Sequence, residues 1–167
     1  MSILTSIGLT PAAPGTIIPN YAPYALITNF IFAYGLLSSR TLKQWYGLDH
    51  NVSPREDLSK YGPAAVSSGK VSQRTLNMLK RNESAHANAV ENYTLLVAGV
   101  TCAMIAGVEK VQLNRAVLGY TLARVGYAVV YVTVERPWLS QIRGVCWWAG
   151  NLCCLGLLYK AGEILSA

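Results

Sequence analysis

The side chains best suited to chemistry lie in residues 79–108, LKRNESAHANAVENYTLLVAGVTCAMIAGV. The first half of this stretch contains polar residues whose spacing places them on one narrow stripe of a helix, since successive residues advance by about 100°. These residues are Arg81, Ser84, Asn88 and Glu91. The second half is apolar enough to lie in lipid, where an acid and an amide are costly unless they face protein or a ligand. The stripe is therefore the first candidate for a binding site.

Two later stretches show a similar spacing of polar or aromatic side chains, three or four positions apart. They contain Tyr120, Arg124, Tyr127 and Tyr131 in the first stretch and Arg143, Trp147 and Asn151 in the second. Arg40 ends an earlier apolar stretch. The arginines at this level face a single acid, Glu91. Because unpaired buried cations are costly, this surplus of positive charge predicts an anionic ligand.

A structural interpretation of the same residues stays open. Glu91 and Arg124 fall at similar depths when positions are counted at about 1.5 Å per residue, so they could form a clamp between two helices, with Asn88 as a bridge. Tyr127 and Tyr131 could anchor a helix at the membrane interface. We favour the structural role for Glu91 and Asn88, and the functional role for Arg143.

The composition indicates the class of protein. Of the 167 residues, 52% are hydrophobic and 13% are charged, and the mean hydropathy is +0.30. A soluble domain has about 25% charged residues. The sequence therefore predicts an all-α integral membrane protein, a four-helix bundle that forms one domain over residues 1–167.

The predicted spans are close to the length that a bilayer requires, and one is longer because it begins as an amphipathic helix. They cover residues 21–39, 76–108, 116–134 and 139–159. Residues 40–75 form the one long polar segment, and Pro54, Gly62 and Pro63 predict a loop there with one short helix. Residues 1–19 have no charged side chain and predict a short lumenal or interfacial tail.

Lysine and arginine are distributed unevenly about these spans. Only Lys110, Arg115 and Lys160 lie on the side of the termini, and Arg124 lies inside a span. The other ten lie in residues 40–81 or at positions 136 and 143. The positive-inside rule then predicts lumenal termini and a cytosolic loop at 40–75. This bias accounts for the net charge of +6. No basic stripe with stacking aromatics indicates a nucleic-acid partner.

The four cysteines are predicted inside the spans as small packing residues. They are Cys102, Cys146, Cys153 and Cys154. No CxxC pair and no His/Cys spacing predicts a metal site.

Residues 85–92, AHANAVEN, resemble the second-helix signature of the MAPEG family, the membrane-associated proteins in eicosanoid and glutathione metabolism. Residues 53–62, SPREDLSKYG, resemble the acidic, proline-led loop after the first helix of that family. Residues 124–131, RVGYAVVY, resemble its third-helix pattern, and Arg143 resembles the arginine that opens its fourth helix. The resemblance covers all four predicted spans in order.

The resemblance implies a homotrimer in the endoplasmic reticulum membrane or, as an alternative, the outer mitochondrial membrane. It implies glutathione as co-substrate, bound between neighbouring subunits with its thiol toward the bilayer. The residues that it assigns to glutathione binding are Arg40, Arg81, Asn88, Glu91, Arg124, Tyr127 and Tyr131. It assigns Arg143 the catalytic role of stabilising the thiolate. A lipophilic small-molecule substrate entering from the lipid bilayer is the expected second partner.

Three positions depart from the family pattern. Gly144 replaces the serine that follows the fourth-helix arginine in prostaglandin-forming members, Trp147 replaces a tyrosine, and Ala87 replaces an arginine. A membrane glutathione transferase or peroxidase acting on lipophilic electrophiles or lipid hydroperoxides is the first hypothesis. A non-catalytic membrane scaffold or regulator is the alternative, although a scaffold has no need of converging arginines. A channel or transporter subunit is disfavoured because neither inverted repeats nor broken helices are visible.

Overall fold

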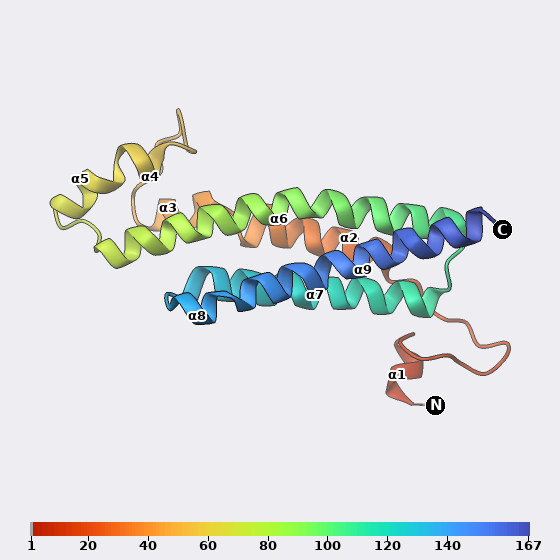
Figure 1. The fold of residues 1–167 in the computed structure, drawn as a ribbon. Helices are drawn as coiled ribbons and strands as arrows, with labels where there is room; N and C mark the ends of the chain where they lie inside the picture. The colour runs from red at the N-terminus through yellow and green to blue at the C-terminus, as the bar shows by residue number, and fades with distance from the viewer. Residues whose placement is uncertain (1) are drawn as a thin grey trace.

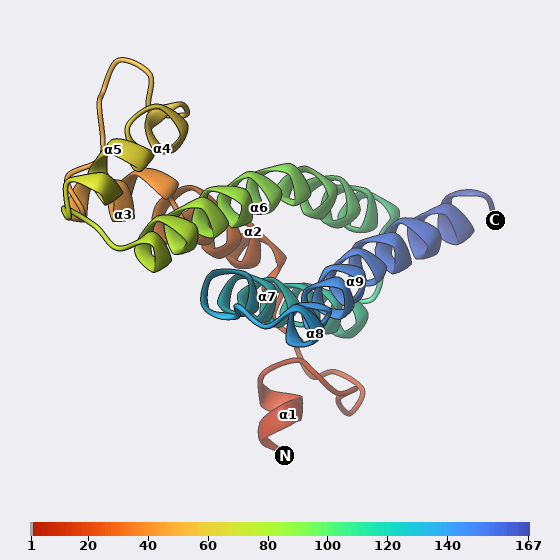
Figure 2. The same cartoon turned by 60° about the vertical axis from the view of Figure 1, so that its left-hand side comes forward.

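The computed structural model describes residues 2–167, and over that range it contains helices and no strands. The long helical segments lie side by side (Figures 1 and 2). They are α2 (Ala22–Phe30) with its continuation η1 (Ile31–Leu36), α6 (Gln73–Ala106), α7 (Lys110–Thr133) and α9 (Ile142–Leu165). The short helices are α1 (Ile3–Ser6), α3 (Ser39–Trp45), α4 (Asp57–Lys60), α5 (Gly62–Ser67) and α8 (Pro137–Ser140). Both termini lie at one end of the bundle, opposite α3, α4 and α5 (Figure 1).

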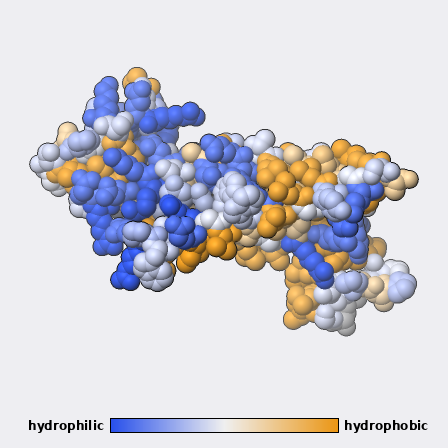
Figure 3. All heavy atoms as spheres, in the orientation of Figure 1, coloured by the Kyte–Doolittle hydropathy of each residue, from blue (hydrophilic) through white to orange (hydrophobic). Residues whose placement is uncertain are grey.

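Two helices, α6 and α7, are long and apolar enough to cross a membrane by length and composition. The predicted all-helical class is therefore confirmed. Figure 3 shows hydrophilic residues gathered at the end formed by α3, α4 and α5, and hydrophobic residues toward the end that holds the termini. This separation is typical of a protein with one end in water and a body in lipid.

The sequence around α6 explains where this longest helix begins and ends. The Ser72 hydroxyl accepts a hydrogen bond from the Thr75 N–H at 3.0 Å, which caps the first turn. Gly107 ends the helix with φ of +76°, a left-handed conformation that glycine adopts without steric cost. α6 therefore starts at Gln73, slightly before the expected residue 76, because the Ser72 cap stabilises its amphipathic first turn.

The first span differs most from expectation. It was expected as one helix over residues 21–39, but α2 passes into a π-helix, in which the Leu37 N–H donates to the Phe32 carbonyl at 2.9 Å. The helix then breaks before α3, and residues 40–75 form three short helices instead of one. These helices close their own apolar core against the start of α6. That core consists of Leu48, Leu58, Ala65, Val71, Leu76 and Leu79.

Small residues bring α6, α7 and α9 close together. A Cβ placed on Gly99 of α6 lies 3.1 Å from the Cys154 carbonyl oxygen of α9, so a larger residue there forces the helices apart. Cys153 packs in the same way against Gly119 of α7, where its Sγ is 3.1 Å from the glycine's Cβ position. All four cysteines are free thiols, as expected for packing residues.

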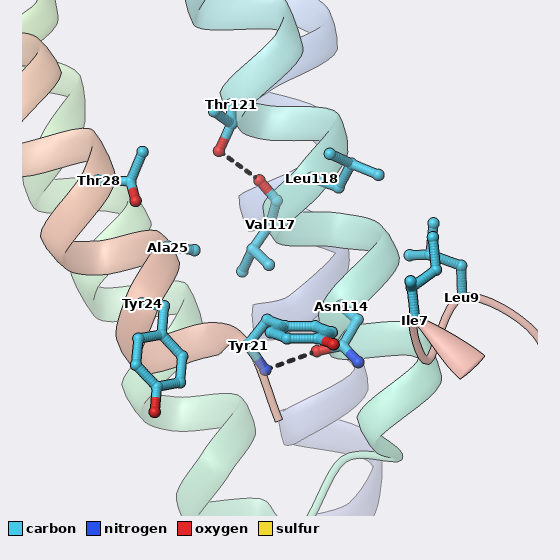
Figure 4. Close-up of a pocket in the computed structure, with 10 residues that line it drawn as sticks. All are labelled: Ile7, Leu9, Tyr21, Tyr24, Ala25, Thr28, Asn114, Val117, Leu118 and Thr121. Carbon is cyan, nitrogen blue, oxygen red and sulfur yellow. Dashed lines mark hydrogen bonds between the residues drawn. The ribbon is translucent and has the colours of Figure 1, made fainter. Parts of the chain in front are cut away.

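The N-terminal segment folds back across the start of α7 and is fixed there by one buried amide. The Asn114 side chain, 1% exposed, donates to the carbonyls of Gly8 and Pro19 at 3.1 and 2.9 Å. It also accepts the Tyr21 N–H at 3.0 Å (Figure 4). An apolar cavity of about 280 Å³ lies beside these contacts, between α2, α7 and the N-terminal segment (Figure 4). Asn114 therefore connects the tail to the bundle.

Replacing Asn114 with alanine should release this segment. The change leaves the Gly8 and Pro19 carbonyls and the Tyr21 N–H without partners, at a cost of about 1–3 kcal/mol. Hydrogen exchange measured by mass spectrometry should show faster exchange of the Tyr21 amide. The control is Asn77→Ala, at an exposed asparagine whose side chain bonds only Gln73. Unchanged exchange at Tyr21 in the Asn114 variant contradicts the anchoring role.

Candidate functional site

Four of the predicted site residues line one cavity of about 250 Å³ at the end of the bundle away from the termini. They are Asn88, Tyr127, Tyr131 and Arg143, and the remaining wall is formed by Gly144 and Trp147. We call this space the Arg143 cavity. Helices α6, α7 and α9 each contribute to it, so the sequence prediction that three spans converge at one level holds for these residues.

Arg124 lies behind this cavity and is almost fully buried, with 2% of its surface exposed. Its Nη2 donates to the Asn88 Oδ1 at 2.8 Å, and its guanidinium lies 4.5 Å from the centre of the Tyr127 ring. Its Nη1 is buried without a hydrogen-bond partner among residues 2–167. A buried cation held only by an amide and an aromatic face keeps a net positive charge in the bundle.

Arg143 lies at the start of α9, at the mouth of the cavity. Its guanidinium stacks 4.3 Å from the centre of the Tyr131 ring, and its Nε donates to the Ser140 carbonyl at 3.2 Å. No carboxylate within residues 2–167 pairs with it. The neighbouring residue is a glycine, Gly144, so this position supplies no hydroxyl. The position that a Cβ would occupy there has no heavy atom within 4 Å.

Arg81 does not reach the Arg143 cavity. Its Nε donates to the Val132 carbonyl at 3.2 Å and its Nη2 to the Glu135 Oε1 at 3.1 Å, so it connects α6 to the end of α7. Hydrogen bonds from Arg74, and then from Arg81, hold the pKa of Glu135 below its ordinary value. This contact is therefore fully present above the ordinary glutamate pKa and is lost as the pH falls through the lowered one.

Arg40 and Glu91 line a second cavity, of about 510 Å³, between α6 and the segment that includes Pro54. We call it the Arg40 cavity. Arg40 forms a two-point contact with Asp49, with Nε–Oδ1 and Nη2–Oδ2 distances of 3.1 and 2.8 Å. Arg40 thereby holds the pKa of the Asp49 carboxyl below its ordinary value. Glu91 is exposed, and the clamp to Arg124 considered from the sequence is not formed in residues 2–167.

His86 lies on the opposite side of α6 from the predicted polar stripe, where the sequence predicts a surface or subunit-contact residue, but it is half-buried against the first span. Its Nδ1 lies 3.0 Å from the Ala33 carbonyl oxygen in η1, and its ring lines the Arg40 cavity. The π-helix shifts the backbone pairing by one residue, which explains why a side chain from α6 can satisfy a carbonyl of the first span. Nothing in the apolar sequence 31–36 indicates a π-helix, so this contact could not be predicted.

An exposed stripe on α6 lies beside the two cavities, and two of its residues, Ala87 and Glu91, line the Arg40 cavity. Its residues are spaced alternately three and four positions apart, and nearly all are small or polar. They are Asn77, Lys80, Ser84, Ala87, Glu91, Thr94, Ala98, Thr101 and Ile105. We call this set the α6 stripe. The exposed face of α9 is different, since it presents large apolar side chains. Those include Val145, Trp148, Leu152, Leu155 and Tyr159.

The helical fold, the membrane-length helices and the polar cluster at one end define a helical membrane protein. A sequence profile of the MAPEG family matches residues 20–162, so the chain belongs to the MAPEG family. The comparison with curated proteins and the comparison with solved structures each gave no match.

The Asn88–Arg124 hydrogen bond generates a stability prediction. Asn88→Ala removes the one side-chain acceptor of a buried guanidinium, which should lower the free energy of unfolding by about 1.5–3 kcal/mol. Denaturant unfolding in detergent measures the effect. Asn92→Ala is the matched control, because the Asn92 side chain has no bonded partner in residues 2–167 and only its carbonyl is used, by Tyr120. Equal losses in both variants contradict a specific role for Asn88.

Proposed function

We propose that the protein is a membrane-bound glutathione-dependent transferase or peroxidase that acts on lipophilic electrophiles or lipid hydroperoxides. The observation that supports this function most directly is the charge around the Arg143 cavity. Arg124 and Arg143 stand on two sides of it, and neither has an acidic partner in residues 2–167. Since an uncompensated cation in a low-dielectric site is costly, the cavity favours an anionic ligand.

Glutathione fits this charge pattern. It has two carboxylates and one ammonium, and a guanidinium binds a carboxylate through two parallel hydrogen bonds. The Arg143 guanidinium, which pairs with no carboxylate of residues 2–167, is one donor available to it. Glu91 is the acid that can accept the ammonium, because it is exposed on the α6 stripe and pairs with no cation of residues 2–167. Asp49 and Asn51 hold the Arg40 guanidinium in one orientation.

The site is completed between subunits. At about 250 Å³ the Arg143 cavity is smaller than the roughly 300–1,000 Å³ of most small-molecule sites, so it lacks a wall. The α6 stripe supplies the surface for a neighbour, because small residues let helices approach closely and exposed polar groups are costly in lipid. In a homotrimer packed along this stripe, the Arg143 cavity of one subunit faces the Arg40 cavity of the next.

The four long helical segments are proposed as membrane spans. The 24 residues of α9 reach about 36 Å, enough for a hydrocarbon core of about 30 Å, and their exposed apolar face suits lipid. The excess of lysine and arginine at the end formed by α3, α4 and α5 supports a cytosolic position for that end. The endoplasmic reticulum membrane is the proposed location, with lateral entry of the lipophilic substrate.

Arg143 has the catalytic role in this proposal. When bound, glutathione supplies a thiol that reacts as its thiolate. A guanidinium beside the sulfur in a water-poor site lowers a thiol pKa from about 8.5 by roughly 1–3, which is enough to populate the thiolate at neutral pH. Because Gly144 provides no hydroxyl, Arg143 performs this role without a neighbouring hydrogen-bond donor.

Arg143→Leu should keep glutathione binding, measured by calorimetry, because other arginines hold the carboxylates. It should abolish the ultraviolet absorbance of bound thiolate and the conjugation of glutathione to a chloronitrobenzene. Arg143→Lys should restore the thiolate absorbance and the conjugation in part, because lysine keeps the positive charge but lacks the planar guanidinium. Arg136→Leu is the control, at an exposed arginine just before α8 that does not line the Arg143 cavity.

One result on the unmodified protein contradicts the enzyme proposal. If it binds glutathione but shows no thiolate absorbance at neutral pH, the protein is a scaffold or regulator that uses glutathione as a ligand only. Oxidised glutathione, which has no thiol, is the control for the absorbance signal.

A further inference from the structure

A fourth cavity lies between α7 and α9, at the end of the bundle that holds the termini. It measures about 380 Å³. It is lined by Gln112, Arg115, Ala116, Leu152, Cys153, Gly156, Leu157 and Lys160. We call it the Arg115 groove. Lys160 is about 25 Å from Arg143 along α9, counted at about 1.5 Å per residue, so the groove is separate from the proposed glutathione site.

The groove exists because its walls are made from small residues. Gly156 has no heavy atom within 4 Å of the position that a Cβ would occupy, so that position opens into free space. Ala116 forms the wall across from it on α7. Three residues further along α7, the Cys153 sulfur lies 3.1 Å from the position that a Cβ on Gly119 would occupy, so the two helices are in close contact there. The result is a slot between two helices with an apolar floor.

Two cations stand at the rim of this slot. Arg115 is exposed, and its Nε donates to the Leu9 carbonyl at 2.6 Å, while its two terminal nitrogens have no bonded partner in residues 2–167. Lys160 pairs with Glu163 at 2.6 Å, but both side chains are about half exposed, at 50% and 44%. Such a surface pair contributes little, so the ammonium remains available to a second acceptor.

The faces of the two helices next to the slot are apolar and exposed. On α7 they present Leu118 and Leu122, and on α9 they present Leu152 and Leu155. These residues have the exposure and character of a lipid-facing surface, unlike the α6 stripe. The slot therefore has positive charge at the end nearest the water and apolar surface toward the middle of the membrane.

We infer that the Arg115 groove binds an anionic phospholipid, with its phosphate between Arg115 and Lys160 and an acyl chain along Leu152 and Gly156. Two arguments favour this occupant. The rim has the positive charge that attracts a phosphate group, because Arg115 and Lys160 both line the groove and neither is neutralised by a buried acid. The apolar floor, which includes Leu152 and Gly156, is continuous with the exposed apolar surface of α9, which is suited to contact with acyl chains. A free anion would contact the cations at the rim but not the apolar residues of the floor.

The test is native mass spectrometry of the purified full chain in detergent, titrated with phosphatidylinositol and, separately, with phosphatidylcholine. Phosphatidylinositol should bind at least about tenfold more tightly, because each nearby cation favours the anionic lipid. The double variant Arg115→Gln/Lys160→Gln should lose this preference. Lys110→Gln is its control, since Lys110 is an exposed cation at the same end of α7 but does not line the groove.

A second variant tests the apolar floor without changing the charge. Gly156→Leu should fold normally, because the position is open, and it should fill the slot and weaken phosphatidylinositol binding by about tenfold. Gly162→Leu is its matched control, at another open glycine of α9 outside the groove. Equal binding of the two lipids, or unchanged binding by Gly156→Leu, overturns the inference. Inorganic phosphate that competes as strongly as the lipid overturns it as well, because it identifies a site for a free anion.

Discussion

The structure depends on a guanidinium buried among three helices without an acid to pair with it. Arg124 of α7 reaches the Asn88 amide of α6, lies over the Tyr127 ring and passes close to Gly150 of α9, whose Cβ position is 3.5 Å from the Arg124 Cδ. Desolvating a cation is costly, and an amide and an aromatic face compensate only part of that cost. The helices must therefore approach closely at this level, and the remaining charge gives the cavity in front of it a preference for anions.

The α6 stripe is explained by the same cost of exposing polar groups to lipid. A helix that exposed Glu91, Thr94 and Thr101 to acyl chains would be unfavourable, whereas the same residues packed against a neighbouring copy can bond across the interface. Alternate spacing of three and four residues suits packing at a shallow crossing angle. In the proposed homotrimer, packing along this stripe brings the Arg143 cavity of one subunit against the Arg40 cavity of the next, so assembly and formation of the proposed glutathione site are one event.

Residue spacing in the sequence was sufficient to predict the long helices α6, α7 and α9, because the 3.6-residue helical period determines which side chains share a face. It also predicted the contact between Asn88 and Arg124, because a buried charge requires a partner. It was not sufficient for Glu91. Three residues on a helix turn the chain by about 300°, so Glu91 points about 60° away from Asn88, and which side of that arc faces α7 depends on helix rotation. The Arg40–Asp49 contact and the His86–Ala33 contact also required the fold, because the first depends on a turn outside the helices and the second on a π-helix.

The central claim is that the glutathione site combines the Arg143 cavity of one subunit with the Arg40 cavity of the next. It is tested by mixing subunits that contain Arg40→Leu with subunits that contain Arg143→Leu, and measuring conjugation of glutathione to a chloronitrobenzene. Each variant alone should be inactive as a homotrimer. Every mixed trimer contains one interface at which an intact Arg143 cavity faces an intact Arg40 cavity, so the account predicts that mixing restores activity. If both cavities serve a site within a single subunit, no mixed trimer has an intact site, and the absence of any recovery contradicts the account.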